Sequence, residues 1–192
     1  HIDTYKDWYA PELHALLICA RERERWWKAA DLWHETGMST AVAERVLSIH
    51  RYALETAGIE VRRDFDTGLS PVMGEAGALH QVILNLVVNA EQALVSRPGP
   101  RLLIVRTRES SEGVVLSVVD NGPGIPRDRL KHIFDPYHTT KPAGTGLGLG
   151  ISAGIVRDHG GQLWAESDEG RGTARAVMGL CVAGLGLLGL GI

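Results

Sequence analysis

The order in which helical and strand patterns follow one another most limits the folds open to this chain. Some stretches place apolar side chains at helical spacing, whereas others are short and either alternate in polarity or are rich in β-branched residues. The helical stretches are 41–57, 75–95 and 146–159, and the strand-like stretches are 59–65, 101–108, 114–120, 162–167 and 174–180, with a further short strand near Val72. Because the later strands come in pairs joined by turns, we expect an α+β layer sandwich whose helices lie on one sheet face.

Composition and charge limit the classes of partner. The chain has 192 residues, 44% of them hydrophobic, which suffices for one compact domain with additional ends. The net charge of -3 and the isoelectric point near 6.3 argue against a nucleic-acid partner, because phosphate binding normally leaves a basic excess. Cys19 and Cys181 match no metal spacing, so we expect reduced thiols in a cytoplasmic setting.

The two ends of the chain differ in character from its middle. Residues 5–25 have helical composition and end in a charged run, and 26–40 lose the helical spacing, which predicts a linker there. Residues 176–192 carry no charge and are rich in glycine, but they fall short of a typical membrane span. We expect the main domain to cover 41–178 and leave the role of the tail, 179–192, open.

Two asparagines on the second helix are candidates for metal binding. Asn85 and Asn89 are four residues apart, so both amides project from one face of the helix while the apolar stripe points to the core. Two amides placed in this way can hold a metal ion together. The same pattern is also typical of a solvated helix face, and the pair alone does not decide between the two interpretations.

A carboxylate and two glycines follow the strand at 114–120. Asp120 stands at the end of the strand, and Gly122 and Gly124 come where a backbone can approach a ligand closely. A carboxylate in this place can accept a hydrogen bond from an exocyclic amine. A simple turn explains the D-N-G-P-G sequence equally well.

A second glycine-rich segment, 144–150, leads into the last predicted helix. Its free amides and the positive end of the helix favour phosphate oxygens. Between the two glycine segments, 121–145 are rich in Gly and Pro, which is typical of a functional loop such as a lid. Within this loop, 133–141 place aromatic side chains before Lys141, a cation that can meet a phosphate. Each segment alone is also compatible with an ordinary surface loop.

In this order and spacing, the four segments resemble the N, G1, F and G2 boxes of the ATP-binding domain of sensor histidine kinases, a family shared with gyrase, the Hsp90 chaperone and MutL. The likeness covers 42–177 and includes the Q-V-I-L-N-L-V-V-N-A stretch, the D-N-G-P-G-I run, the T-T-K sequence and G-R-G-T at 170–173. Within the family, the chain is most similar to kinases of the nitrogen-regulation type. The resemblance implies the Bergerat ATP-binding fold, a two-layer α/β sandwich with a mixed, mostly antiparallel sheet.

The resemblance also implies ATP and Mg²⁺ as cofactors. Asn89 would coordinate Mg²⁺ and Asn85 would support the metal or the phosphates, while Asp120 would bind the adenine amino group with help from the Thr173 hydroxyl. Asn85, Asn89 and Lys141 would take part in catalysis. The remaining nucleotide contacts implied by the resemblance are Gly122, Gly124, Ile125, Lys141, Gly144, Thr145, Gly146, Leu147 and Gly148.

Position 85 separates phosphoryl transfer from hydrolysis within the family. ATP-hydrolysing relatives have a glutamate there to activate water, and the amide of Asn85 cannot take that proton. The resemblance therefore favours a protein histidine kinase, which passes the γ-phosphate to a histidine of a dimerising hairpin and then to the receiver domain of a response regulator. The alternatives are a non-catalytic nucleotide-binding scaffold and an ATP-hydrolysing relative.

The sequence departs from the family pattern at both ends. The H-E-[IL]-R motif that carries the acceptor histidine does not occur, and His14 lies in a segment similar to the end of the second hairpin helix. We therefore assign 1–25 to that helix, so the homodimer would form through a hairpin mostly missing from this chain. After Thr173 the family closes with an alternating strand, whereas here the residues are more apolar and rich in glycine. We expect a cytoplasmic domain and leave open whether the full-length protein is anchored to a membrane.

Overall fold

The structure is a computed structural model, and every described residue lies in one compact unit of the chain, Thr36–Ile192. The described residues are 38–70, 72, 74–96, 98–111, 113–135, 146–168 and 173–181, with the backbone alone at 38–39, 168 and 173–181. The predicted helix at 5–25, His14, residues 136–145 of the predicted lid and the tail from 182 onward lie outside these residues.

Helices and strands follow one another in the predicted order. The helices are α3 (Met38–Thr56), α4 (Ala76–Val95), α5 (Arg127–Leu130) and α6 (Gly148–Asp158), and the strands are β1 (Ile59–Phe65), β2 (Arg101–Ser110), β3 (Gly113–Asp120), β4 (Gln162–Asp168) and β5 (Thr173–Cys181). The bounds of β1 coincide with the predicted strand. Within this part of the chain, no helix is both long enough and apolar enough to cross a membrane.

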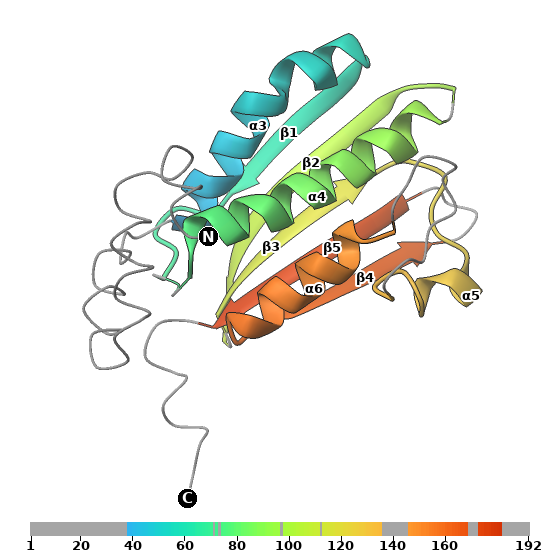
Figure 1. Cartoon of the computed structure of the whole chain (residues 1–192). Helices are drawn as coiled ribbons and strands as arrows, with labels where there is room; N and C mark the ends of the chain where they lie inside the picture. The colour runs from blue at the N-terminus through green and yellow to red at the C-terminus, as the bar shows by residue number, and fades with distance from the viewer. Residues whose placement is uncertain are drawn as a thin grey trace, which may run out of the picture. The chain divides into compact units, whose positions relative to one another are not determined.

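The strands form a single mixed sheet in the order β1-β2-β3-β5-β4. Only the β1–β2 pair is parallel, whereas β2–β3, β3–β5 and β4–β5 are antiparallel. Helices α3, α4 and α6 lie side by side on one face of the sheet (Figure 1). This architecture confirms the predicted α+β two-layer sandwich with a mostly antiparallel sheet.

The apolar stripe of α4 holds this helix against the middle of the sheet. Leu79, Val82, Ile83 and Leu86 are each at most 2% exposed, while Gln81 on the opposite side is exposed. They pack against β2 and β3, whose buried residues Leu103, Val105, Leu116 and Val118 point to the helix side. Full burial of one such side chain stabilises the fold by roughly 1.5–3 kcal/mol, so this layer makes up much of the core.

Two boundaries differ from the sequence prediction at the edges of the domain. Helix α3 begins at Met38, so residues 38–40 belong to the helix and not to the predicted linker. The Thr40 hydroxyl lies 3.4 Å from the Thr107 hydroxyl on β2, a tertiary contact that local spacing does not reveal. Strand β5 runs to Cys181, so the predicted domain end at 178 cuts through a strand.

Two further differences concern short elements. Val72 forms an isolated β-bridge and not the predicted strand. The predicted loop 121–145 contains the short helix α5, which follows Pro126. Proline is compatible with a helix start, because the backbone N–H groups of the first turn have no partner within the helix. The sequence analysis did not predict this helix, because it is short and lies in a segment rich in glycine and proline.

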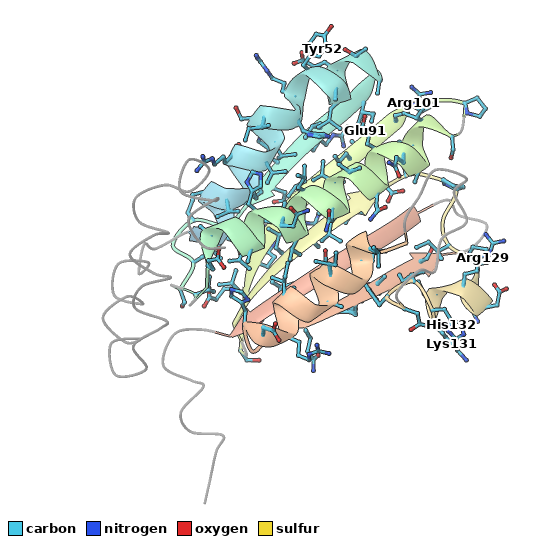
Figure 2. The ribbon with its side chains drawn as sticks, viewed as in Figure 1. Tyr52, Glu91, Arg101, Arg129, Lys131 and His132 are labelled. Atoms are coloured by element: carbon cyan, nitrogen blue, oxygen red, sulfur yellow. The ribbon has the colours of Figure 1, made fainter. Side chains whose placement is uncertain are left out.

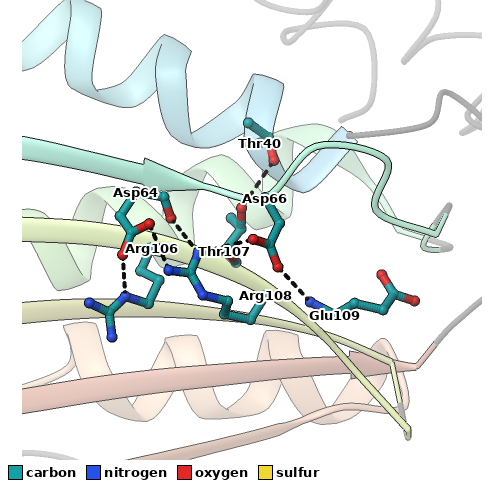
Figure 3. Close-up of polar contacts among 7 residues, drawn as sticks. All are labelled: Thr40, Asp64, Asp66, Arg106, Thr107, Arg108 and Glu109. Carbon is teal, nitrogen blue, oxygen red and sulfur yellow. Dashed lines mark hydrogen bonds and ion pairs between the residues drawn. The ribbon is translucent and has the colours of Figure 1, made fainter.

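Ion pairs link the parallel strands β1 and β2 (Figure 3). The Asp64 carboxylate accepts hydrogen bonds from Arg106 (2.7 Å) and lies 2.6 Å from Arg108, and both guanidinium groups lower the pKa of Asp64. Asp66 accepts from the backbone N–H of Glu109 at 3.4 Å. Because these groups are well exposed, their ion pairs contribute little to the stability of the fold. They are, however, consistent with the register in which β1 pairs with β2.

Candidate functional site

Asp120 is a buried carboxylate at the end of a central strand. It is the last residue of β3 and is only 7% exposed. Its Oδ1 accepts a hydrogen bond of 2.8 Å from the Gly122 backbone N–H. Burial raises the pKa of Asp120 to about 6, and the hydrogen bond from Gly122 opposes this rise. Among the described residues, this buried carboxylate is thus held by a hydrogen bond from its own loop.

The backbone after Asp120 is held close to the carboxylate. A Cβ atom on Gly122 would lie 2.5 Å from Asp120 Oδ1, so a side chain there would displace the hydrogen-bonded carboxylate. Gly124 has φ 76°, in the left-handed region that favours glycine. Both glycines of the D-N-G-P-G sequence are therefore required by local geometry.

Two residues that the sequence analysis did not single out anchor this loop. Asn121 accepts from the Leu102 backbone N–H (2.8 Å) and donates to the Pro100 carbonyl (3.0 Å), which fastens the loop to the start of β2. The Ser167 hydroxyl on β4 accepts from the Ile125 N–H at 2.7 Å. Asn121 lies inside the predicted motif, so its position was a usable signal, whereas no sequence pattern marks Ser167.

A pocket of about 100 Å³ opens beside Asp120. It is lined by Leu86, Asn89, Ala90, Ala93, Val118, Asp120, Gly124, Ile125, Ile133, Phe134, Leu149 and Ala165. The predicted site residues Asn89, Asp120, Gly124 and Ile125 therefore meet at one place. The walls are mainly apolar, and the pocket is small beside the roughly 300–1,000 Å³ of typical ligand sites, so it suits a flat ring and not a whole nucleotide.

The two asparagines of α4 have different surroundings. Asn89 is half-buried and lines the pocket. Asn85, one turn earlier, donates through Nδ2 to the Gly148 carbonyl (3.1 Å) and to the Ser152 hydroxyl (3.0 Å), both on α6. In this structure Asn85 is thus hydrogen-bonded to α6, whereas Asn89 lines the pocket, and their shared role at a metal or phosphate stays a prediction.

The second glycine segment leads into α6. Gly146 has φ 67°, and Leu147 precedes the first helical residue, Gly148. The helix therefore begins beside Asn85, with Leu149 at the pocket wall. The predicted site residues Lys141, Gly144 and Thr145 lie outside the described residues.

Thr173 begins β5, next to the end of β3. Its neighbour Ala174 pairs with Asp120 across the antiparallel β3–β5 ladder. The backbone of Thr173 is thus one residue from the strand position opposite the buried carboxylate. Its side chain lies outside the described part of the chain, so the predicted hydroxyl contact stays a prediction.

The segment around α5 separates charged from apolar side chains. Arg129 on α5, and Lys131 and His132 directly after this helix, are exposed to solvent (Figure 2). Ile133 and Phe134, which follow directly, are half-buried and line the pocket. The predicted aromatic segment therefore contributes apolar walls to the site, while its neighbouring cations face away.

The oxygen atoms that the pocket offers as ligands suit a metal ion that binds together with phosphate groups. Within the described residues, no group of three or more His, Cys, Asp or Glu side chains is placed to hold a metal ion. Mg²⁺ is usually bound by one or two protein oxygens together with phosphate oxygens and water. The amide oxygen of Asn89 at the pocket wall is a suitable protein ligand of this kind.

A family model and curated relatives match this chain. The model described as "Histidine kinase-, DNA gyrase B-, and HSP90-like ATPase" matches residues 74–180. The sensory histidine kinase/phosphatase NtrB of Rhizobium meliloti is 40% identical over 146 residues, which cover 67% of this chain and 38% of NtrB. The signal transduction histidine-protein kinase AtoS of Escherichia coli is 36% identical over 144 residues, which cover 73% of this chain and 22% of AtoS. The chain therefore spans less than half the length of these relatives.

Solved structures share the fold. The catalytic domain of histidine kinase ThkA, in a nucleotide-free form, superposes with a TM-score of 0.66 at 28% identity, covering 74% of this chain and 91% of that domain. The mycobacterial sensor histidine kinase MprB has a TM-score of 0.63 at 27% identity, covering 74% of this chain and 93% of that structure. Both comparisons cover nearly all of the solved domain.

Proposed function

This chain belongs to the family of histidine kinase-, DNA gyrase B- and HSP90-like ATPases, as a histidine kinase ATP-binding domain, and on that premise we propose that it transfers the γ-phosphate of ATP to a histidine of a helical hairpin. The phosphoryl group would then pass to the receiver domain of a response regulator. This transfer, and the activity of the whole protein, extend beyond the matched domain.

The observation that carries the proposal is the buried carboxylate of Asp120 in an apolar pocket. Adenine offers a flat ring and one exocyclic amine, so it matches a small, mainly apolar pocket with a buried carboxylate in its wall. A buried acceptor that gains a donor is stabilised, because otherwise its desolvation is not compensated. Asp120 would therefore select the adenine amine, with the Thr173 hydroxyl assisting from the start of β5.

The phosphates would lie between α4 and the start of α6. Asn89 would hold Mg²⁺ through its amide oxygen, and the amides of Gly146 and Gly148 would donate to phosphate oxygens at the positive end of α6. Lys141, Gly144, Thr145 and Leu147 are proposed as further contacts. Bound Mg²⁺ neutralises phosphate charge and orients the γ-phosphoryl group for in-line transfer.

Position 85 supports transfer to a protein acceptor over hydrolysis. An amide has no basic site to take a proton from water at neutral pH. Both N–H groups of Asn85 already donate to Gly148 and Ser152. No described residue at this place therefore acts as the base that hydrolysing relatives require.

We further propose the arrangement of the longer protein. Residues 1–25 would end the second hairpin helix, and the linker would follow up to the start of α3 at Met38. Dimerisation through that hairpin would bring the acceptor histidine to the catalytic domain. The domain would operate in the cytoplasm, where ATP is available.

Isothermal titration of the chain with ATP, with and without Mg²⁺, tests the proposal. We expect binding that tightens with Mg²⁺, and we expect Asn89→Ala to remove the effect of Mg²⁺. Asp120→Asn should weaken ATP binding by about 1–3 kcal/mol, because the donor and acceptor no longer match. Asp128→Asn, the same chemical change on exposed α5, is the control and should bind ATP normally. Equal affinity in the Asp120 and Asp128 variants would rule out the adenine role.

A further inference from the structure

Asn85 joins the two helices that border the proposed phosphate site. Its Nδ2 donates to the Gly148 carbonyl and to the Ser152 hydroxyl, and Ser152 in turn donates to the Gly148 carbonyl at 2.8 Å. Ser152 is completely buried, and its partners Asn85 and Gly148 are half-buried. These three residues form a closed set of hydrogen bonds, which we call the α4–α6 clasp.

The Asn85 amide has no hydrogen-bond donor left for a phosphate. A side-chain amide has two N–H donors, and both are used within the clasp. Its Oδ1 accepts a hydrogen bond of 2.9 Å from Gln81. The amide orientation follows from chemistry, because the Gly148 carbonyl can only accept and must therefore face the nitrogen.

The clasp acts on the nucleotide end of α6. The other end of this helix is fastened separately, because His159 Nε2 accepts from the Glu75 backbone N–H at 3.0 Å and its Nδ1 lies 2.7 Å from the Ile155 carbonyl. Because the His159 end of α6 is held, the clasp fixes the position of the first turn of α6 and of its backbone N–H groups. These amides are the groups proposed to meet the phosphates.

We infer that Asn85 is a positioning residue that acts on ATP through α6, by holding Gly148 and Ser152, and is not itself a hydrogen-bond donor to the phosphates. The inference rests on the proposed function and deepens it, because it assigns the phosphate affinity of this domain to a contact between two helices. Asn89, which lines the pocket, remains the metal ligand.

A double-mutant cycle separates a positioning role from direct binding. Asn85→Ala and Ser152→Ala should each weaken Mg²⁺-ATP binding by up to about tenfold, the upper range for one buried hydrogen bond. The double variant should lose less affinity than the sum of the two single losses, since each single change already breaks part of the same closed set of hydrogen bonds. Adenosine, which has no phosphates, should bind all variants alike. Gln81→Ala leaves the clasp intact and is the matched control, with unchanged ATP affinity.

Hydrogen exchange without nucleotide provides a second measurement on the folded chain. Amides of the first turn of α6 should exchange faster in both clasp variants, and at the wild-type rate in Gln81→Ala. Additive losses of ATP affinity, or unchanged exchange in Ser152→Ala, would overturn the positioning role. If those results came with normal ATP binding by the wild type and loss of the Mg²⁺ effect in Asn89→Ala, the proposed function would stand without this inference. If the wild type failed to bind ATP, both would fall.

Discussion

At the residue scale, Asp120 combines a proposed role in adenine binding with a cost in the stability of the fold. Burial raises its pKa from 3.8 to about 6, so the folded protein binds a proton more tightly than the unfolded chain. Below pH 3.8 the carboxyl group is protonated in both the folded protein and the unfolded chain, so its burial does not lower the free energy of unfolding through ionisation. Between pH 3.8 and about 6 the unfolded chain loses this proton before the folded protein does, so the free energy of unfolding falls by about 3 kcal/mol over this range and levels off above it.

Asp120→Asn should remove this pH dependence. The neutral amide keeps an oxygen for the Gly122 N–H, so the variant should be more stable than the wild type at pH 8 by about 1–3 kcal/mol. At pH 5, where the wild-type carboxyl is largely protonated, the difference should shrink. Urea denaturation of both chains at the two pH values measures it. A difference that does not change with pH would contradict the raised pKa.

Glycines of the domain should differ in their tolerance of a methyl group. Gly122→Ala should lower the free energy of unfolding by about 1–3 kcal/mol and weaken ATP binding, because the new Cβ would push against Asp120 Oδ1. Gly154→Ala in α6 is the matched control, because a Cβ there would have no heavy atom within 4 Å. Urea denaturation and ATP titration of the two variants test this, and equal effects would argue against a specific role for Gly122.

At the element scale, His159 fastens the end of α6 to the start of α4. His159→Ala should lower the free energy of unfolding by about 1–3 kcal/mol, because the Glu75 N–H loses its acceptor in a partly buried place. His132→Ala is the control: this histidine is exposed and pairs with Asp135 on the surface, so the change should stay within about 0.5 kcal/mol. Chemical denaturation of both variants gives the comparison, and similar losses would exclude the proposed fastening.

Strand β5 should need its last residues. Gly179, Leu180 and Cys181 pair with the beginning of β3, and β5 is an inner strand of the sheet. A chain that ends at 178 should therefore be less stable than a chain that ends at 181, by about 2 kcal/mol for the lost backbone hydrogen bonds. Thermal denaturation of these two truncated chains isolates the contribution of 179–181. Equal melting temperatures would show that the strand ends earlier.

At the scale of the whole molecule, this chain should bind ATP and yet not phosphorylate itself. In-line transfer needs a nucleophile placed beside the γ-phosphate, and the sequence contains no H-E-[IL]-R motif to supply one. Incubation with γ-labelled ATP should leave the chain unlabelled, whereas a supplied hairpin domain of the full-length protein should become labelled. Acid-labile phosphate on His14 would show that the acceptor is present after all.

The sequence by itself determined the order of the elements and most of the candidate site. Helical and strand periodicity are local properties, so the stripe of α4 and the strand ending at Asp120 could be read directly. The resemblance of the motifs to the histidine kinase family also implied that Asn89, Asp120, Gly124 and Ile125 belong to one site, and these residues line one pocket.

Only the tertiary structure decided how distant segments meet. The parallel pairing of β1 with β2 and the insertion of β5 between β3 and β4 depend on contacts between residues far apart in the chain. For the same reason, no local pattern revealed that Asn85 is bound to Ser152, or that Ser167 holds the loop at Ile125. Such hydrogen bonds form because packing of the apolar faces brings the polar groups into reach, so their partners follow from the fold and not from spacing along the chain.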